Sequence, residues 1–198
     1  MAAVSLSNQC AIVGVGNTAY TRGTEKTTVE LHLEAALAAI ADAGLNVGDI
    51  DAVMPNEMSG VIAEDLLINL GIPDLRFTST IRTGGASYVT AMQSACLAIT
   101  TGVANYVLLT AGRRGYSAQR VSKLSEGTMV PMPIMATCDE FERTYGNTVA
   151  AQHFAHAARR HMHEYGTTSE HFGHVAVACR KHANMNPGAL MHGKPMTL

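Results

Sequence analysis

The residues most able to take part in a reaction form a glycine-rich turn, Thr83-Gly84-Gly85-Ala86-Ser87. An apolar, strand-like stretch precedes this turn, and an Ala-rich helical pattern follows it. A strand that turns sharply into a helix is a common way to present a nucleophile, because the side chain at the tip lies beside the unpaired amides of the helix N-terminus. The tip contains no cysteine, so the pattern indicates helix amides without a thiol.

A second group of chemically active residues is the histidines, since eight of the nine lie at or beyond His153. His153 and His156 are three residues apart, and the same spacing separates His171 and His174. Each pair could share one helix face and contact one metal ion. However, no acidic residue completes a HExxH arrangement, and partly exposed helical histidines are common. We therefore expect no metal site.

A third pattern, at residues 14–19 (GVGNTA), matches the loose dinucleotide fingerprint GxGxxA after an apolar run. That fingerprint requires the helix to begin within the motif, so that its N-terminus faces the pyrophosphate. Here residues 20–26 intervene, with Gly23 among them. The spacing therefore argues against nicotinamide binding.

Length and charge limit the classes of function. The 198 residues suffice for one ordinary domain with a substantial core. The net charge is -2, and no basic cluster exceeds two adjacent arginines, so nucleic acid has no electrostatic support as a partner. The apolar runs are shorter than the roughly 20 residues of a membrane span, and the first ten residues lack the features of a signal peptide. We expect a soluble, cytoplasmic protein without a membrane partner.

The four cysteines are widely separated and form no CxxC pair. This spacing suggests neither a zinc site nor a disulfide framework. We expect four buried, reduced thiols, at Cys10, Cys96, Cys138 and Cys179.

Strand and helix patterns alternate over residues 1–112, which we take as an α/β core with a sheet covered by helices. The clearest helix follows Thr27, which stands three residues before Glu30 in a capping-box arrangement, and ends before Gly44. The apolar runs predict strands at 10–15, 50–54, 77–81 and 106–111, the last buried on both faces. Helical spacing and stop signals predict helices at 28–43, 62–70 and 87–101.

Residues 113–198 form the second predicted region, an irregular excursion followed by helices at 148–165 and 169–183. The excursion, residues 113–145, is too long for a simple connection and indicates a functional or interface segment. Met132 and Met135 offer flexible apolar surface, while Pro131 and Pro133 stiffen the backbone. We expect an adaptable wall for a bulky hydrophobic ligand or a dimer contact, with ordinary core filling as the alternative.

The order and spacing of several strings resemble the N-terminal half of thiolases over nearly the whole chain. The sterol-carrier and lipid-transfer branch is the most similar part of that family. The strings are AIVGVGNTAYTRG, IADAGL, DIDAV, GGAS, NYVLLTAG, HMHEYGTTSEHFGHVAVACRKHANMNPGAL and KPMT. The resemblance implies a thiolase-like fold, with layered helices around a mixed sheet. It also implies a fragment that ends before the C-terminal thiolase half and leaves an open sheet edge.

In thiolases the turn between strand and helix carries the nucleophilic cysteine, and the resemblance places Gly85 at that position. Glycine there has no side chain, whereas covalent acyl transfer needs a thiolate. Cys96 cannot substitute, because eleven helical residues span about 16 Å. The simpler interpretation is that Gly84 and Gly85 only make the turn possible. The family's activating histidine and second cysteine belong to the C-terminal half, so we assign no catalytic residue here.

Some lipid-transfer-type relatives have lost the cysteine and act as aldolases on the CoA-thioester side chain of a sterol. They use tyrosines of the C-terminal half and a small OB-fold partner. The resemblance therefore implies a retro-aldol lyase with an acyl-CoA as substrate and no further cofactor. A non-catalytic acyl-CoA- or lipid-binding subunit and an acetyl-CoA acyltransferase are the alternatives. The expected partners are a second copy, a C-terminal thiolase half or an OB-fold protein. The expected substrate-binding residues are Gly84, Gly85, Ala86, Ser87, Met132 and Met135.

Overall fold

The computed structural model describes residues 6–21, 23–56, 60–115, 140–147 and 150–198. The chain divides into two compact units, Met1–Ser125 and Glu126–Leu198, and each is described by itself. The expected boundary between residues 112 and 113 stays a prediction.

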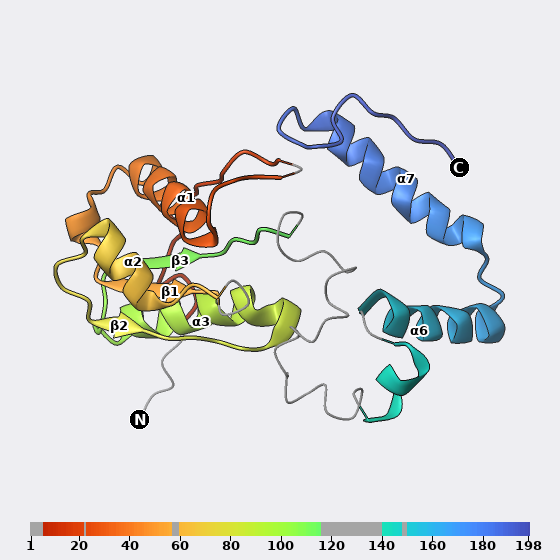
Figure 1. Ribbon diagram of the computed structural model, residues 1–198, viewed down its shortest axis with the longest axis horizontal. Helices are drawn as coiled ribbons and strands as arrows, with labels where there is room; N and C mark the ends of the chain where they lie inside the picture. Colours follow the sequence, from red (N-terminus) through yellow and green to blue (C-terminus); the bar gives the residue numbers. More distant parts are fainter. Residues whose placement is uncertain (1–5, 22, 57–59, 116–139, 148–149) are drawn as a thin grey trace. The chain divides into compact units, whose positions relative to one another are not determined.

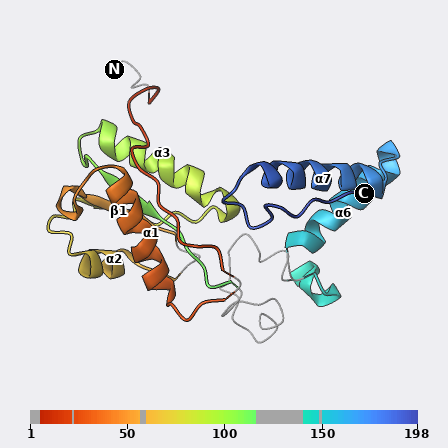
Figure 2. The ribbon, with the colours of Figure 1, turned by 90° about the horizontal axis from the view of Figure 1, so that it is seen from above.

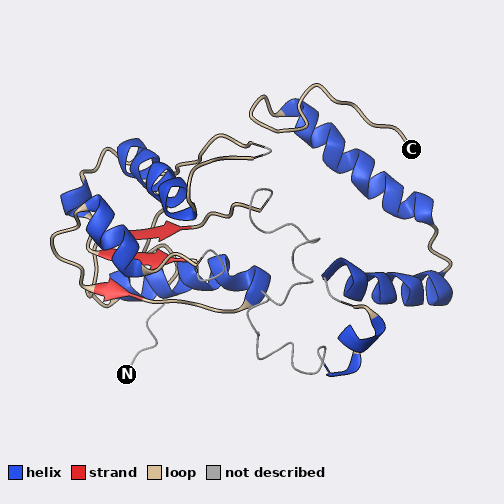
Figure 3. Cartoon of the chain, in the orientation of Figure 1, coloured by secondary structure: helices blue, strands red, loops and turns tan. Residues whose placement is uncertain are grey.

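The first unit is built on a parallel three-stranded sheet with the strand order β2-β1-β3. The strands are β1 (Ala52–Pro55), β2 (Phe77–Thr78) and β3 (Val107–Thr110). The helices are α1 (Thr28–Asp42), α2 (Ala63–Leu70) and α3 (Ser87–Thr100). Helices α1 and α2 cover one face of the sheet, and α3 covers the other (Figures 1, 2 and 3). The predicted α/β class is confirmed.

The two faces of the sheet are packed differently. On the α1–α2 side, Val53 and Leu66 are fully buried together with Ile40 of α1. On the α3 side, the buried residues are the small Ala52 and Ala98. Alternation along β1 places Val53 and Ala52 on opposite faces, as a pleated strand requires. Small side chains on the α3 side let this helix lie close to the sheet.

A buried carboxylate fixes the start of the sheet. Asp51 precedes β1 and is only 7% exposed. Its oxygens accept hydrogen bonds from the backbone N–H of Asn105 and of Tyr106, each at 2.9 Å, and from the Asn105 side-chain amide at 2.9 Å. Burial alone would raise the pKa of Asp51, but these hydrogen bonds and Arg76 together hold it below the usual 3.8. Asp51 therefore joins the beginnings of β1 and β3.

Helix α1 begins as the sequence predicts. The Thr27 hydroxyl accepts from the Glu30 N–H at 3.1 Å, and the Glu30 carboxylate accepts from the Thr27 N–H at 2.6 Å. The backbone hydrogen bond from Thr27 is the main reason that the pKa of Glu30 is lowered. Beyond the helix, Gly44 has a φ of +67°, which glycine adopts readily.

The prediction of a strand at residues 10–15 is wrong, because this segment joins no sheet. Its Val15 N–H donates to the Asp42 carboxylate at 2.9 Å, where a strand would donate to a neighbouring strand. Ile12, Val13 and Val15 are 70%, 58% and 66% exposed. The segment is apolar, as a strand would be, but in this structure no strand lies beside it.

The two glycines of this segment lie against α1. A Cβ atom on Gly14 would lie 2.3 Å from the Ala39 carbonyl oxygen, and one on Gly16 would lie 2.1 Å from that of Ala35. Only residues without a side chain permit such an approach. Close packing on α1 therefore accounts for the glycines of the GVGNTA motif.

The strands are shorter than predicted, most clearly β2, which ends at Thr78 where the pattern continues to Ile81. The prediction that 106–111 is buried on both faces is wrong in part. Leu108 and Thr110 are buried, but Leu109 is 37% exposed on the opposite face. Continuous apolar character therefore overestimates how fully the helices cover β3.

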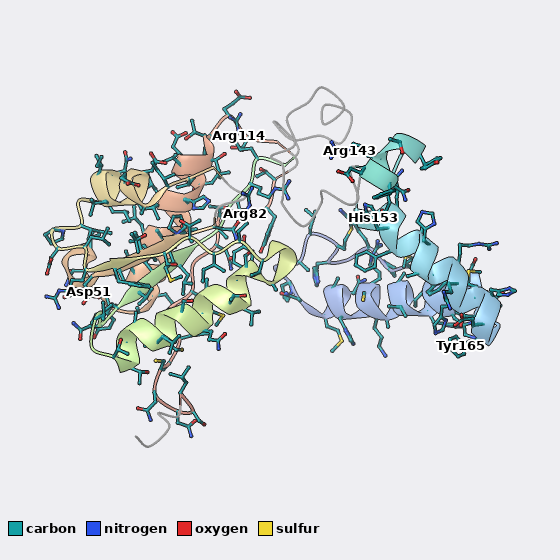
Figure 4. All side chains as sticks on the ribbon, turned by 90° about the horizontal axis from the view of Figure 1, so that it is seen from below. Asp51, Arg82, Arg114, Arg143, His153 and Tyr165 are labelled. Atoms are coloured by element: carbon teal, nitrogen blue, oxygen red, sulfur yellow. The ribbon has the colours of Figure 1, made fainter. Side chains whose placement is uncertain are left out.

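The second unit contains the two predicted helices, α6 (Ala150–Tyr165) and α7 (Ser169–Met185). Within this unit, α7 has no buried residue, and Phe154 and Tyr165 of α6 are 73% and 72% exposed. Figure 4 shows His153 and Tyr165 along α6. In the described residues, no group of three His, Cys, Asp or Glu side chains is arranged to hold a metal ion.

The cysteines differ from the expectation of four buried thiols. Cys10 and Cys96 are partly buried, while Cys179 is exposed because the face of α7 that carries it is uncovered. Cys138 lies outside the described residues. Within the same residues, no helix combines the length and the apolar character that crossing a bilayer requires.

We expect Asp51→Asn to reduce the free energy of unfolding by about 1–3 kcal/mol, since an amide replaces a carboxylate that accepts several hydrogen bonds. Because the folded pKa of Asp51 is lowered, its contribution is complete above the usual carboxyl pKa and is lost as the pH falls through the folded value. Urea unfolding between pH 3 and pH 7 measures both effects. Asp74→Asn, at an exposed carboxylate that also contacts Arg76, is the control. Equal losses in both variants would contradict the role of Asp51.

We expect Gly16→Ala to lower the free energy of unfolding by about 1–3 kcal/mol, because the added methyl group meets the α1 backbone. Gly48→Ala is the matched control, since a Cβ there meets nothing within 4 Å. Chemical denaturation of both variants tests the difference. Equal stabilities would mean that the 10–16 segment does not lie against α1.

Candidate functional site

The glycine turn has the predicted form. Gly84–Ala86 make one 3-10 turn, and α3 begins directly after it at Ser87. Gly84 has a φ of +61°, which favours glycine. Gly85 is not in that region, and a Cβ there would meet nothing within 4 Å. The backbone therefore needs glycine at position 84 but not at position 85.

The Ser87 side chain holds this turn together. Ser87 is 3% exposed, and its hydroxyl donates to the Gly84 carbonyl at 2.7 Å and accepts from the Thr83 N–H at 3.0 Å. Both hydrogen-bonding directions of the hydroxyl are thus used inside the turn. Ser87 supports the shape of the site, while Gly85 and Ala86 form its exposed surface.

The first turn of α3 is suited to an anionic oxygen. Its N-cap residue, Ala86, makes no side-chain hydrogen bond, and no acidic residue lies in the first turn. Amides at a helix N-terminus carry partial positive charge and attract anions. The N–H groups of Ala86 and Ser87 already donate to the carbonyls of Thr83 and Gly84. What this helix end offers is its partial positive charge, which can attract a negatively charged oxygen next to the open space at Gly85.

The outer face of α3 is uncovered near the turn, so the expectation of a buried helix holds only for its inner face. Tyr88, Val89 and Met92 are 46%, 72% and 40% exposed. Burial raises the pKa of Tyr88, while the positive charge of Arg113 acts in the opposite direction. Arg113 follows β3. Its positive charge therefore acts on Tyr88, in the first turn of α3.

A cavity of about 300 Å³ lies in the same unit. It is lined by the 16–24 loop, by Leu31 and Ala35 of α1, and by residues 111–115. The glycine turn does not line it. Met132 and Met135 lie outside the described residues. In Figure 4, Arg82, which precedes the turn, and Arg114, which lines the cavity, both lie at the opposite end of the unit from Asp51.

A buried histidine beside this cavity was missed by the sequence analysis. His32 of α1 is completely buried, and its Nδ1 lies 2.8 Å from the Thr110 hydroxyl oxygen. Burial lowers the pKa of His32, and a backbone interaction with Gly112 acts in the opposite direction. A Cβ on Gly112 would lie 2.8 Å from the imidazole. The sequence did contain a signal for its burial: His32, Ala36 and Ile40 are spaced four residues apart, which puts them on one face of α1.

Cys96 is not a substitute nucleophile. Burial raises the pKa of its thiol, and contact with Cys10 raises it further. The neutral thiol is a poor nucleophile, and the α3 residues between Gly85 and Cys96 separate it from the turn. The described residues at the turn therefore offer a helix end with partial positive charge and open space, but no nucleophile.

Comparison with known proteins identifies several relatives of this chain. No family model matches it. It is 35% identical over 193 residues to a steroid side-chain-cleaving aldolase of Thermomonospora curvata, covering 98% of this chain and 49% of the relative. It is also 35% identical to the 17-hydroxy-3-oxo-4-pregnene-20-carboxyl-CoA lyase of Mycobacterium tuberculosis, with coverage of 98% and 50%. Sterol carrier protein 2 of Bos taurus is 29% identical, with coverage of 92% and 34%.

The fold agrees with these relatives. A solved structure described as the Ltp2-ChsH2(DUF35) aldolase matches with a TM-score of 0.82 and 36% identity. The match covers 94% of this chain and 46% of the solved one. The chain thus spans about half the length of the aldolases it matches. It belongs to the thiolase-like superfamily.

Proposed function

We propose that this chain is part of a thiolase-fold lyase that binds a bulky, sterol-like acyl-CoA and cleaves its side chain by a retro-aldol reaction. One observation carries the proposal: Gly85, without a side chain, lies at the exposed turn before α3 in a chain 35% identical to a steroid side-chain-cleaving aldolase. The proposed binding residues are Gly84, Gly85, Ala86 and Ser87 at the turn, with Met132 and Met135.

The turn suits the chemistry of carbon–carbon cleavage. In a retro-aldol step a base removes the proton of a β-hydroxyl group, and the carbon–carbon bond breaks as a ketone forms. The released electron pair moves onto the thioester carbonyl and gives an enolate, which is then protonated at carbon. The partial positive charge at the α3 N-terminus would stabilise the enolate oxygen, where negative charge develops. The open space at Gly85 would accommodate a branched carbon centre.

Within the described residues at the turn, no side chain is positioned as the acid or base. Ser87 is occupied inside the turn, and His32 is buried against Thr110 and Gly112. We therefore propose that proton transfer belongs to tyrosines of a C-terminal thiolase half, as the resemblance to cysteine-less lipid-transfer-type aldolases implies. In this proposal the chain supplies the oxyanion site and part of the binding wall.

The proposed assembly follows from the same reasoning. The partners would be a second copy or a C-terminal thiolase half, together with a small OB-fold protein. The matching aldolase structure is described with ChsH2(DUF35), which supports a second component. We place the protein in the cytoplasm, where acyl-CoA is available.

Two other functions remain alternatives. A non-catalytic acyl-CoA- or lipid-binding subunit would use the same turn without chemistry, and the resemblance to sterol carrier protein 2 favours it. An acetyl-CoA acyltransferase is supported by 30% identity to the acetyl-CoA acetyltransferase of Methanothermobacter thermautotrophicus. The missing thiol at position 85 weighs against acyl transfer.

The lyase proposal is tested with a β-hydroxyacyl-CoA whose hydroxyl group is tertiary and ring-borne. The chain is assayed as isolated with any copurifying polypeptide, and chromatography follows the ketone and the shortened acyl-CoA. Both products should appear in equal amounts. Saturable binding of the thioester without products would favour the non-catalytic subunit, and transfer of the acyl group to free CoA would favour the acyltransferase.

We expect no acyl-enzyme on this chain. After incubation with acetyl-CoA and denaturation, its intact mass should be unchanged, because no thiol lies at the turn. Gly85→Cys should form at most a partial adduct, since the backbone has room for the side chain but the activating histidine is absent. Gly48→Cys, also in open space, should form less. A stable adduct on the unsubstituted chain at Cys96 or Cys138 would contradict the proposal.

We expect the double substitution Met132→Ala and Met135→Ala to weaken the binding of a ring-bearing acyl-CoA more than that of acetyl-CoA. Each lost methylene contact is worth about 0.8 kcal/mol, and only the larger ligand would make such contacts. Calorimetric titration with both ligands measures the difference. Met185→Ala, at a residue 73% exposed on α7, is the control. Equal weakening for both ligands would indicate damaged packing.

A further inference from the structure

Two cysteine residues far apart in the chain lie in contact within the first unit. The Cys10 Sγ atom donates to the Cys96 carbonyl oxygen at 3.7 Å and lies 3.9 Å from the Thr100 hydroxyl oxygen. Cys10 also lies near enough to the Cys96 thiol to help raise its pKa, after burial, which is the larger cause. Both residues are free cysteines and only partly buried, so small reagents can reach them. Cys10 therefore connects the segment outside the sheet with the middle of α3.

We propose that Cys10 and Cys96 are a reversible oxidation site, which a low-molecular-weight disulfide such as glutathione disulfide converts into an intramolecular disulfide. One protein thiolate attacks the reagent, forms a mixed disulfide and releases one small thiolate. The other protein thiolate then attacks the protein-bound sulfur of that mixed disulfide and releases the second. The net reaction oxidises two protein thiols and reduces one small disulfide to two thiols.

Contact between the two residues favours the second step over a stable mixed disulfide. Once one thiol is modified, its neighbour is already adjacent and needs no large movement to attack. Burial raises the pKa of the Cys96 thiol, so the reaction should be faster at pH 8.5 than at pH 7. Cys179 is exposed on α7 and should instead keep a single glutathione.

The bond would fasten a segment that the sheet does not hold. Residues 10–15 belong to no strand, and their apolar side chains are exposed. The two cysteines are 86 residues apart, so a bond between them restricts the unfolded chain strongly. Because α3 begins at the glycine turn, oxidation would also tie this segment to the helix that carries the proposed site.

The test uses the Cys138→Ser, Cys179→Ser background, in which Cys10 and Cys96 are the remaining cysteines. Incubation with glutathione disulfide should leave the chain about 2 Da lighter, and dithiothreitol should reverse the change. Peptide mapping without reductant should recover the peptides of Cys10 and Cys96 joined to each other. The melting temperature should rise by roughly 5–10 °C.

Adding Cys10→Ser or Cys96→Ser to this background should abolish the mass loss and leave a mixed disulfide on the remaining thiol. If these variants fold poorly, peptide mapping of the oxidised, unsubstituted chain still decides the question. Stable glutathione on both cysteines, a bond from either one to Cys138 or Cys179, or no reaction under conditions that modify Cys179 would overturn the proposal.

Discussion

The hydrogen bonds of Asp51 are the constraint on which the rest of the first unit depends. Its carboxylate holds the start of β3 through Asn105 and Tyr106. Its backbone carbonyl accepts from the Arg76 N–H at 2.8 Å and so holds the start of β2. Asp51 therefore holds together the beginnings of all three strands, which run parallel to one another. Their opposite ends must then lie at a common edge, where loops of open α/β sheets commonly bind ligands.

The chain uses that edge for two different purposes. After β2 it forms the glycine turn, whose hydrogen bonds are satisfied internally by Ser87. After β3 it passes Gly112, where the missing side chain makes room for the buried imidazole of His32. The first arrangement leaves a helix end with partial positive charge beside open space, and the second fills the core. The structural role of Gly84 and the chemical role proposed for Gly85 can thus be separated, because only Gly84 has a φ that demands glycine.

Local patterns predicted much of this fold, and long-range contacts account for what they missed. The cap at Thr27 and the glycine turn depend on residues a few positions apart, so the sequence contained the whole signal. The function of Asp51 depends on partners 54 and 55 residues away. Similarly, the apolar run at 10–15 indicates a strand but says nothing about whether another strand lies beside it. His32 was missed because its partner, Thr110, is 78 residues further along.

These differences bear on what the chain can do by itself. A retro-aldol step needs an acid–base group, an electron sink and a pocket that excludes water. In the proposed reaction the α3 N-terminus would stabilise the charge on the electron sink, but Tyr88, Val89 and Met92 beside it are exposed. Water at that surface would weaken every hydrogen bond to a developing enolate, since such bonds gain strength in a low dielectric. If the proposed lyase reaction is correct, the part of the enzyme that supplies the acid and base would therefore also cover this face of α3. Catalysis and burial of α3 would then appear together.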